Sequence, residues 1–79
     1  MVRILYFAAL KQVTNIAGES YDCAGEPVSV LLERVQERHG QLRPLLQHCR
    51  VAVNRHFVPL THVLEVNDEI AIIPPVAGG

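Results

Sequence analysis

The chain has 79 residues, 49% of them hydrophobic and 19% charged, and a formal net charge of -1. A chain this short supports one domain with one core, because it buries only about 60 to 65% of its unfolded surface, and this composition is globular rather than disordered. Seven Lys and Arg against eight Asp and Glu leave no basic stripe for nucleic acid. No apolar run reaches the roughly 20 residues of a membrane-spanning helix, so we expect a cytoplasmic protein without a membrane partner.

The first predicted element is a strand at residues 2–8, where apolar side chains alternate onto both faces. Apolar groups on both faces indicate a strand at the centre of a sheet. A short helix-compatible segment follows at residues 9–15, and Gly18 precedes a second strand at residues 19–24. We expect these two strands to form a hairpin with a wide connection.

The main helix is predicted at Pro27, which suits the first helical position because it has no N–H to leave unpaired. Apolar residues then recur at the i, i+3, i+4 and i+7 positions of one helical face, at Val28, Leu31, Leu32 and Val35. Gly40 is expected to end the helix in the left-handed conformation. Because this face must be buried, Leu32→Asp is expected to unfold the domain.

The second half of the chain predicts three more strands. A short helical turn is expected at residues 42–48, and residues 50–54 then alternate as a third strand. After a tight turn, residues 56–58 return as a short edge strand. Residues 70–73 form an apolar run that is typical of a strand covered on both faces.

The order β, β, α, β, β, β predicts an α+β protein, because a single amphipathic helix must be buried across a sheet. If the last strand lies beside the first and parallel to it, the fold is a β-grasp, as in ubiquitin, with a mixed sheet of four or five strands. Residues 1–73 are the expected domain. Residues 74–79 are the expected flexible, extended tail.

This tail reads Pro74-Pro75-Val76-Ala77-Gly78-Gly79. Proline ends sheet pairing and favours an extended backbone, so six residues can reach about 20 Å from the domain. Two glycines make the tip narrow enough for a channel that a β-carbon would block. The alternative is that they are only a frayed end.

The useful group of such a tail would be the carboxylate of Gly79. It resists nucleophiles until it is activated, for example as an acyl-adenylate, after which a sulfur nucleophile could leave a thiocarboxylate. The chain has no phosphate-binding loop of its own. We therefore expect no bound cofactor, and ATP would be used by an activating partner.

No self-contained enzyme is predicted. The two cysteines, Cys23 and Cys49, have no metal-ligand spacing, and the four histidines form no HxH or HExxH motif, so no metal site is expected. Both thiols are expected to be reduced and half-buried, with their roles left open. No hydroxyl group has the partners that nucleophilic catalysis requires.

Residues 67–79 closely resemble the end of the small, sulfur-carrying subunit of molybdopterin synthase. In that family, Gly-Asp-Glu-Val-Ala and two hydrophobic residues precede Pro-Pro-Val-x-Gly-Gly. The resemblance extends to Val53-Asn54 and to the opening strand at residues 2–8, so it covers nearly the whole chain. Asn67 replaces the usual Gly but tolerates a left-handed turn. Pro27 stands where many members have a Thr cap.

This resemblance implies a protein cosubstrate. An adenylyltransferase related to ubiquitin-activating enzymes would adenylate Gly79, and a sulfur donor that the sequence does not identify would then provide the thiocarboxylate. The tail would insert into the large synthase subunit and donate sulfur to cyclic pyranopterin monophosphate, which builds molybdopterin. The large subunit would hold the catalytic groups, in a heterotetramer built around its dimer.

Partner contacts are predicted at an apolar patch and along the tail. The patch comprises Phe7, Phe57, Leu60 and Ile73. Lys11, the only lysine, follows the first strand, where the family often has a basic residue that faces acidic partner groups. The predicted tail contacts are Pro74, Pro75, Val76, Ala77 and Gly78. The alternatives are that the apolar residues complete a small core and that Lys11 is simply solvated.

Three other functions are compatible with the same ending. A β-grasp protein with terminal Gly-Gly could carry sulfur for thiamine synthesis or for transfer-RNA thiolation, although Pro-Pro-Val favours molybdopterin. It could also be a protein modifier conjugated through Gly79. Finally, it could be an interaction module with an inert tail.

Overall fold

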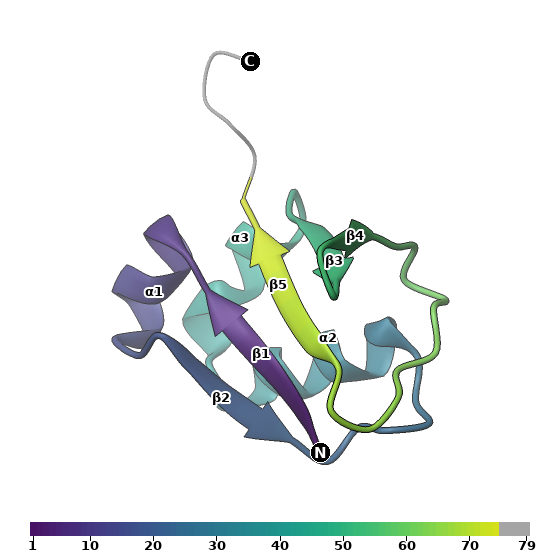
Figure 1. Cartoon of the computed structure of the whole chain (residues 1–79). Coiled ribbons are helices and arrows are strands. Elements are labelled where there is room, and N and C mark those ends of the chain that lie inside the picture. The colour runs from purple at the N-terminus through teal and green to yellow at the C-terminus, as the bar shows by residue number, and fades with distance from the viewer. Residues whose placement is uncertain (75–79) are drawn as a thin grey trace.

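The first and last strands lie side by side and parallel at the centre of a five-stranded sheet (Figure 1). They are β1 (Val2–Tyr6) and β5 (Glu69–Ile73), paired over four residues in the computed structural model, which describes residues 1–74. A mixed sheet whose first and last strands are parallel neighbours, with a helix packed across one face, is a β-grasp. The predicted fold class is confirmed.

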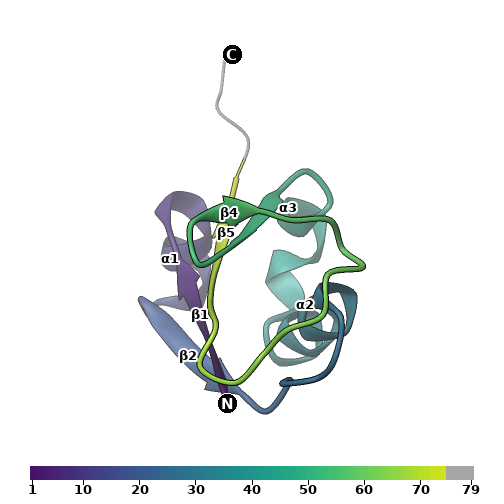
Figure 2. The same cartoon turned by 45° about the vertical axis from the view of Figure 1, so that its right-hand side comes forward.

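The other elements complete the sheet and cover one of its faces. They are α1 (Ala8–Thr14), β2 (Gly18–Tyr21), α2 (Val28–Arg38), the 3-10 helix η1 (Gly40–Leu42), α3 (Arg43–Leu46), β3 (Arg50–Val53) and β4 (His56–Phe57). The strand order is β2-β1-β5-β3-β4, and every neighbouring pair except β1 with β5 is antiparallel. With the sheet turned toward its edge in Figure 2, α2 and α3 lie on the same side of it.

Four strands are shorter than predicted. β3 and β4 each end one residue early, at Val53 and Phe57, and β1 and β2 differ more. β1 ends at Tyr6 instead of residue 8, because Phe7 caps α1 and the chain turns sharply at Ala8, whose φ is 50°. β2 spans only Gly18–Tyr21, because residues 22–27 turn toward the main helix instead of continuing along β1.

The main helix is buried through three side chains instead of four. Val28, Leu31 and Val35 are fully buried in the core, and each buried side chain contributes about 1.5 to 3 kcal/mol. Leu32 is only half-buried and packs against the margin of the core. Full burial of Leu32 is therefore wrong, whereas the unfolding of the domain by Leu32→Asp stays a prediction; Leu31 is the more deeply buried of the two positions.

The residues at the ends of the main helix differ from their predicted roles. Pro27 precedes the helix as its N-cap, with an extended backbone (φ -71°, ψ 159°), and is not its first helical residue. Gly40 begins η1, and His39 ends α2 with a φ of -127°, so the predicted left-handed glycine cap is wrong. The left-handed conformation of Asn67 is confirmed by its φ of 69°.

Both cysteines are free thiols, but they differ in burial. Cys23 is completely buried, contrary to the expected half-buried state, whereas Cys49 is half-buried as predicted. Burial raises the pKa of both thiols. Within residues 1–74, no group of three or more His, Cys, Asp or Glu side chains could hold a metal ion. In that same part of the chain, no helix is long and apolar enough to cross a membrane.

Candidate functional site

The central strand pair determines where the tail leaves the domain. Because β1 and β5 are parallel, with Tyr6 opposite Ile72, the next residues, Phe7 and Ile73, follow at the same end of the sheet (Figure 1). Ile73 and Pro74 are half-buried, and Pro74 is the last residue that the structure describes. The predicted contact residues Pro75, Val76, Ala77 and Gly78 and the predicted reactive Gly79 lie outside the described residues.

The turn from β1 into α1 holds Phe7 at this end of the sheet. Its carbonyl oxygen accepts hydrogen bonds from the backbone N–H groups of Leu10 at 3.0 Å and Lys11 at 3.4 Å. The Phe7 side chain nevertheless remains 48% exposed, and Lys11 is exposed one turn along α1. The backbone of this turn therefore positions an exposed aromatic ring at the end of the sheet where β5 ends, with an exposed lysine in the first turn of the helix that follows.

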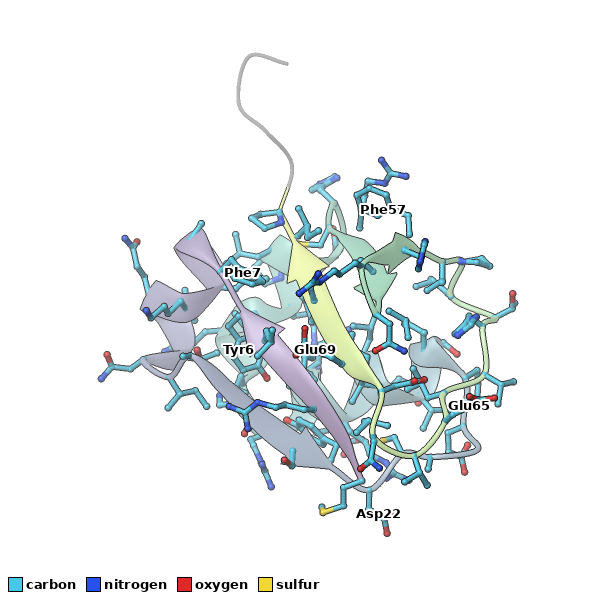
Figure 3. All side chains as sticks on the ribbon, in the orientation of Figure 1. Tyr6, Phe7, Asp22, Phe57, Glu65 and Glu69 are labelled. Carbon is cyan, nitrogen blue, oxygen red and sulfur yellow. The ribbon has the colours of Figure 1, made fainter. Side chains whose placement is uncertain are left out.

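The other side of this strand end carries a stacked pair. Arg50 is the partner of Ile73 in the antiparallel β3–β5 pairing, and its guanidinium lies 3.8 Å from the centroid of the Phe57 ring. Such a cation–π contact orients both groups and contributes about 0.5 to 1 kcal/mol at an exposed site. In Figure 3, Phe7 and Phe57 lie on opposite sides of the end of β5.

We call these five residues the strand-end surface. They are Phe7, Lys11, Arg50, Phe57 and Ile73. The surface continues across the sheet face opposite α2, where Leu5, Ala71, Ala52 and Phe57 are cross-strand neighbours. Ala52 is buried in this row, Leu5 and Ala71 are half-buried, and Phe57 is exposed.

Leu60 does not lie on this strand end. It belongs to the loop after β4, and its carbonyl oxygen accepts a hydrogen bond from the N–H of Ser29 in the first turn of α2. The Leu60 side chain is 53% exposed and shares a surface hollow with Phe57. The predicted patch is therefore divided into two neighbouring groups, with Phe57 common to both.

The strand-end surface is cationic. Among residues 1–74, the ion pairs are those of Arg38 and His39 with Glu19, so neither Lys11 nor Arg50 has a carboxylate partner there. The acidic residues Asp22 and Glu65 lie toward the opposite end of the sheet in Figure 3. These five side chains include no carboxylate, imidazole, hydroxyl or thiol, and Lys11 carries the one amine among them, so the surface is suited to binding and orienting a partner.

Glu19 anchors the main helix to the sheet and is fully engaged. Its carboxylate accepts hydrogen bonds from the hydroxyls of Tyr6 at 2.5 Å and Tyr21 at 3.2 Å and from the Arg38 guanidinium at 2.9 Å, and it lies 2.6 Å from His39 Nε2. Burial raises the pKa of Glu19, but the hydrogen bonds outweigh that effect and lower it to about 2. This cluster is structural, since no lone donor or acceptor faces an opening.

Sequence reasoning missed Arg50 and Leu5. A signal for Arg50 was present, because no Asp or Glu stands between Glu37 and Glu65, and a cation opening a strand in such a stretch has no local partner. For Leu5 the signal was strand alternation, which places it on the opposite face from Ile4. Both required knowledge of which sheet face the helices leave open.

A β-grasp domain whose last strand leads to Gly-Gly defines the class of ubiquitin-like proteins. The ThiS family matches residues 4–79, and the chain belongs to this family. It is 36% identical to the molybdopterin synthase sulfur carrier subunit of Mycobacterium tuberculosis, over 99% of this chain and 96% of that protein. It is 33% identical to the human protein of the same name, over 99% and 93%.

Solved structures agree with this assignment. The fold is similar to that of a putative subunit 1 of molybdopterin converting factor from Pyrococcus furiosus, with a TM-score of 0.86 and 25% identity over 95% of this chain and 97% of that one. It also resembles a chain in the complex of subunits 1 and 2 of molybdopterin-converting factor from Helicobacter pylori. The TM-score there is 0.75, with 29% identity over 99% and 97% of the two chains.

Proposed function

We propose that this chain is the sulfur carrier subunit of a molybdopterin synthase and carries sulfur in the cytoplasm as a thiocarboxylate on Gly79. The observation that carries the proposal is the full-length similarity to relatives named molybdopterin synthase sulfur carrier subunit, within the ThiS family match. The strand-end surface supports it, because cationic and apolar groups beside the end of β5 suit a protein that presents its tail to enzymes.

The thiocarboxylate forms in two steps, adenylation of Gly79 and replacement of AMP by sulfur. The Gly79 carboxylate attacks the α-phosphorus of ATP, pyrophosphate leaves, and an acyl-adenylate forms. A sulfur nucleophile at the oxidation level of hydrosulfide then attacks the acyl carbon, AMP leaves, and a proton is released. ATP and the groups that bind it belong to the activating enzyme, a ubiquitin-activating-like adenylyltransferase.

Sulfur transfer occurs in the large synthase subunit. The thiocarboxylate sulfur attacks a carbon of cyclic pyranopterin monophosphate, and the oxygen substituent of that carbon leaves as its C–O bond breaks. Water then hydrolyses the resulting thioester, so the sulfur stays on the precursor as a thiolate, the acyl group returns as the Gly79 carboxylate and two protons are released. Each chain carries one sulfur atom at a time, so the two sulfurs of the dithiolene require two chains that each bear a thiocarboxylate. The Helicobacter pylori complex of two subunits supports a large-subunit partner, and we propose a heterotetramer.

The test is the intact mass of the protein isolated from cells that make molybdenum enzymes. One oxygen replaced by sulfur at Gly79 is the expected result. A plain carboxylate, even after incubation with ATP, the adenylyltransferase and sulfide, would contradict the proposal. A thiocarboxylate that transfers sulfur to a thiamine precursor or transfer RNA, but not to cyclic pyranopterin monophosphate, would support one of those alternative carriers.

A second candidate is a protein modifier attached through Gly79. The observation that favours it is the likeness to small archaeal modifier protein 1 (SAMP1) of Haloferax volcanii, with a TM-score of 0.87 at 25% identity over 99% of this chain and 98% of that one. The modifier role predicts Gly79 in amide linkage to lysines of other proteins. Mass spectrometry of tryptic digests would detect that linkage, and its absence under conditions that yield thiocarboxylate would leave only the carrier.

A further inference from the structure

A hollow of about 510 Å³ adjoins the strand-end surface on the side of the helices. It lies among α2, α3, β3, β4 and the loop that follows β4. We call it the α2–β4 groove. Its apolar lining includes Leu32, Leu46, Cys49, Val51, Phe57 and Leu60.

The side chains around the groove are under-packed for their size. Leu32 continues the apolar stripe of α2 but is only half-buried, because the groove takes the place of a packing neighbour. Phe57 and Leu60 are 54% and 53% exposed on its rim. Single exposed apolar residues are ordinary, whereas several that line one hollow are typical of a docking site.

The charge around the groove indicates the chemistry of its occupant. Arg50 is the one charged residue of the lining, and no Asp or Glu stands between Glu37 and Glu65. The guanidinium carbon of Arg50 lies 3.8 Å from the centroid of the Phe57 ring, and a guanidinium has N–H groups that can donate two parallel hydrogen bonds to one carboxylate. An apolar segment that also carries an Asp or Glu is therefore complementary.

The groove is continuous with the strand-end surface. Phe57 belongs to both, and Arg50, which lines the groove, pairs with Ile73 at the end of β5. A protein that receives the tail along this surface therefore lies within reach of the groove. A second contact, separate from the tail, would hold this chain on that protein whether or not Gly79 bears a thiocarboxylate.

We propose that the α2–β4 groove is a second docking site, which binds an apolar segment of the large synthase subunit through a carboxylate that pairs with Arg50. This inference rests on the proposed function for the identity of the partner. The groove and its charge are observed in this chain and do not depend on the identity of the partner.

The test uses the full chain with Leu60 replaced by Lys or Glu and measures the Kd for the purified large subunit by calorimetry. Both variants remove the same apolar side chain from an exposed position, so they differ only in charge. If the groove binds an acidic segment, the Leu60→Lys variant is expected to bind the large subunit roughly tenfold more tightly than the Leu60→Glu variant at low salt. The difference should shrink as salt screens the charges.

A matched control pair is available at the opposite end of the sheet. Val66 is 63% exposed and precedes Asn67, whose N–H donates to the Met1 carbonyl oxygen, so it lies far from β5's end. The Val66→Lys and Val66→Glu variants should have equal Kd values. As a second measurement, amide resonances of Cys49, Val58 and Leu60 in the unaltered protein should shift when the large subunit is added.

The outcomes separate the two proposals. If the unaltered chain binds but the Leu60 pair has equal Kd values, or the order is reversed, the acidic groove contact is refuted and the proposed function stands. If groove resonances do not move on binding, the groove is likewise excluded. If the unaltered chain does not bind the large subunit at all, the proposed function fails, and the groove proposal falls with it.

Discussion

Replacing Glu19 with Gln is expected to destabilise the domain at neutral pH and to remove much of its sensitivity to acid. The carboxylate joins β2 to Tyr6 of β1 and to Arg38 and His39 at the end of α2. Glutamine keeps the size of the side chain but cannot offer a charged acceptor to these donors. The Glu19→Gln variant therefore removes the charge and one of the two acceptor oxygens at nearly constant size.

The pKa of Glu19 sets the expected magnitude. A lowering from 4.5 in the unfolded chain to about 2 in the folded protein corresponds to roughly 3 kcal/mol of stability. Because the folded pKa is the lower one, this stabilisation is complete above pH 4.5. It is lost as the pH falls toward 2, where the carboxylate becomes protonated in the folded state as well.

Urea unfolding at pH 6.5 and at pH 3, values on either side of the unfolded pKa, measures the effect. Unaltered protein should be roughly 2 kcal/mol less stable at pH 3 through this group. The difference in free energy of unfolding between the unaltered protein and the Glu19→Gln variant should shrink by a similar amount. A difference between the two proteins that is the same at both pH values would refute the reasoning, whatever the other carboxylates contribute.

Two further predictions concern the core and the tail. Leu31→Ala should lower the free energy of unfolding by about 2 to 5 kcal/mol, and Leu32→Ala by only about 1 kcal/mol, because Leu31 is fully buried and Leu32 borders the groove; equal losses in urea unfolding would contradict the assigned burial. Deleting Gly79 should abolish sulfur transfer in a reconstituted synthase assay and leave the Tm unchanged, whereas full transfer by the shortened chain would sink the carrier proposal.

Much of the fold followed from the sequence because local signals agreed with one another. Apolar alternation, the apolar stripe beginning at Val28 and the apolar run at residues 70–73 together allow few arrangements of one helix on one sheet. The width of the buried helix face was not predictable in the same way. Whether Leu32 is covered depends on how α3 and the loop after β4 pack, and no periodicity in α2 encodes that.

The candidate site was predictable only in part, for a similar reason. Phe7 and Ile73 meet because of the parallel register of two strands that are distant in the chain, and the predicted fold implied that proximity. Leu60 was grouped with them by its hydrophobicity alone, while its position depends on a loop backbone bonded to α2. The Glu19 cluster joins three separate parts of the chain, so no local sequence motif indicates it.

The position of β5 between β1 and β3 also determines how the domain responds to mechanical force. Tension applied along the tail is transmitted into a strand hydrogen-bonded on both sides, and it loads those bonds in shear. They must then break nearly together, whereas an edge strand such as β4 can be peeled away one residue at a time. A partner that pulls on the terminus during release would therefore detach the whole subunit before it unwound the domain.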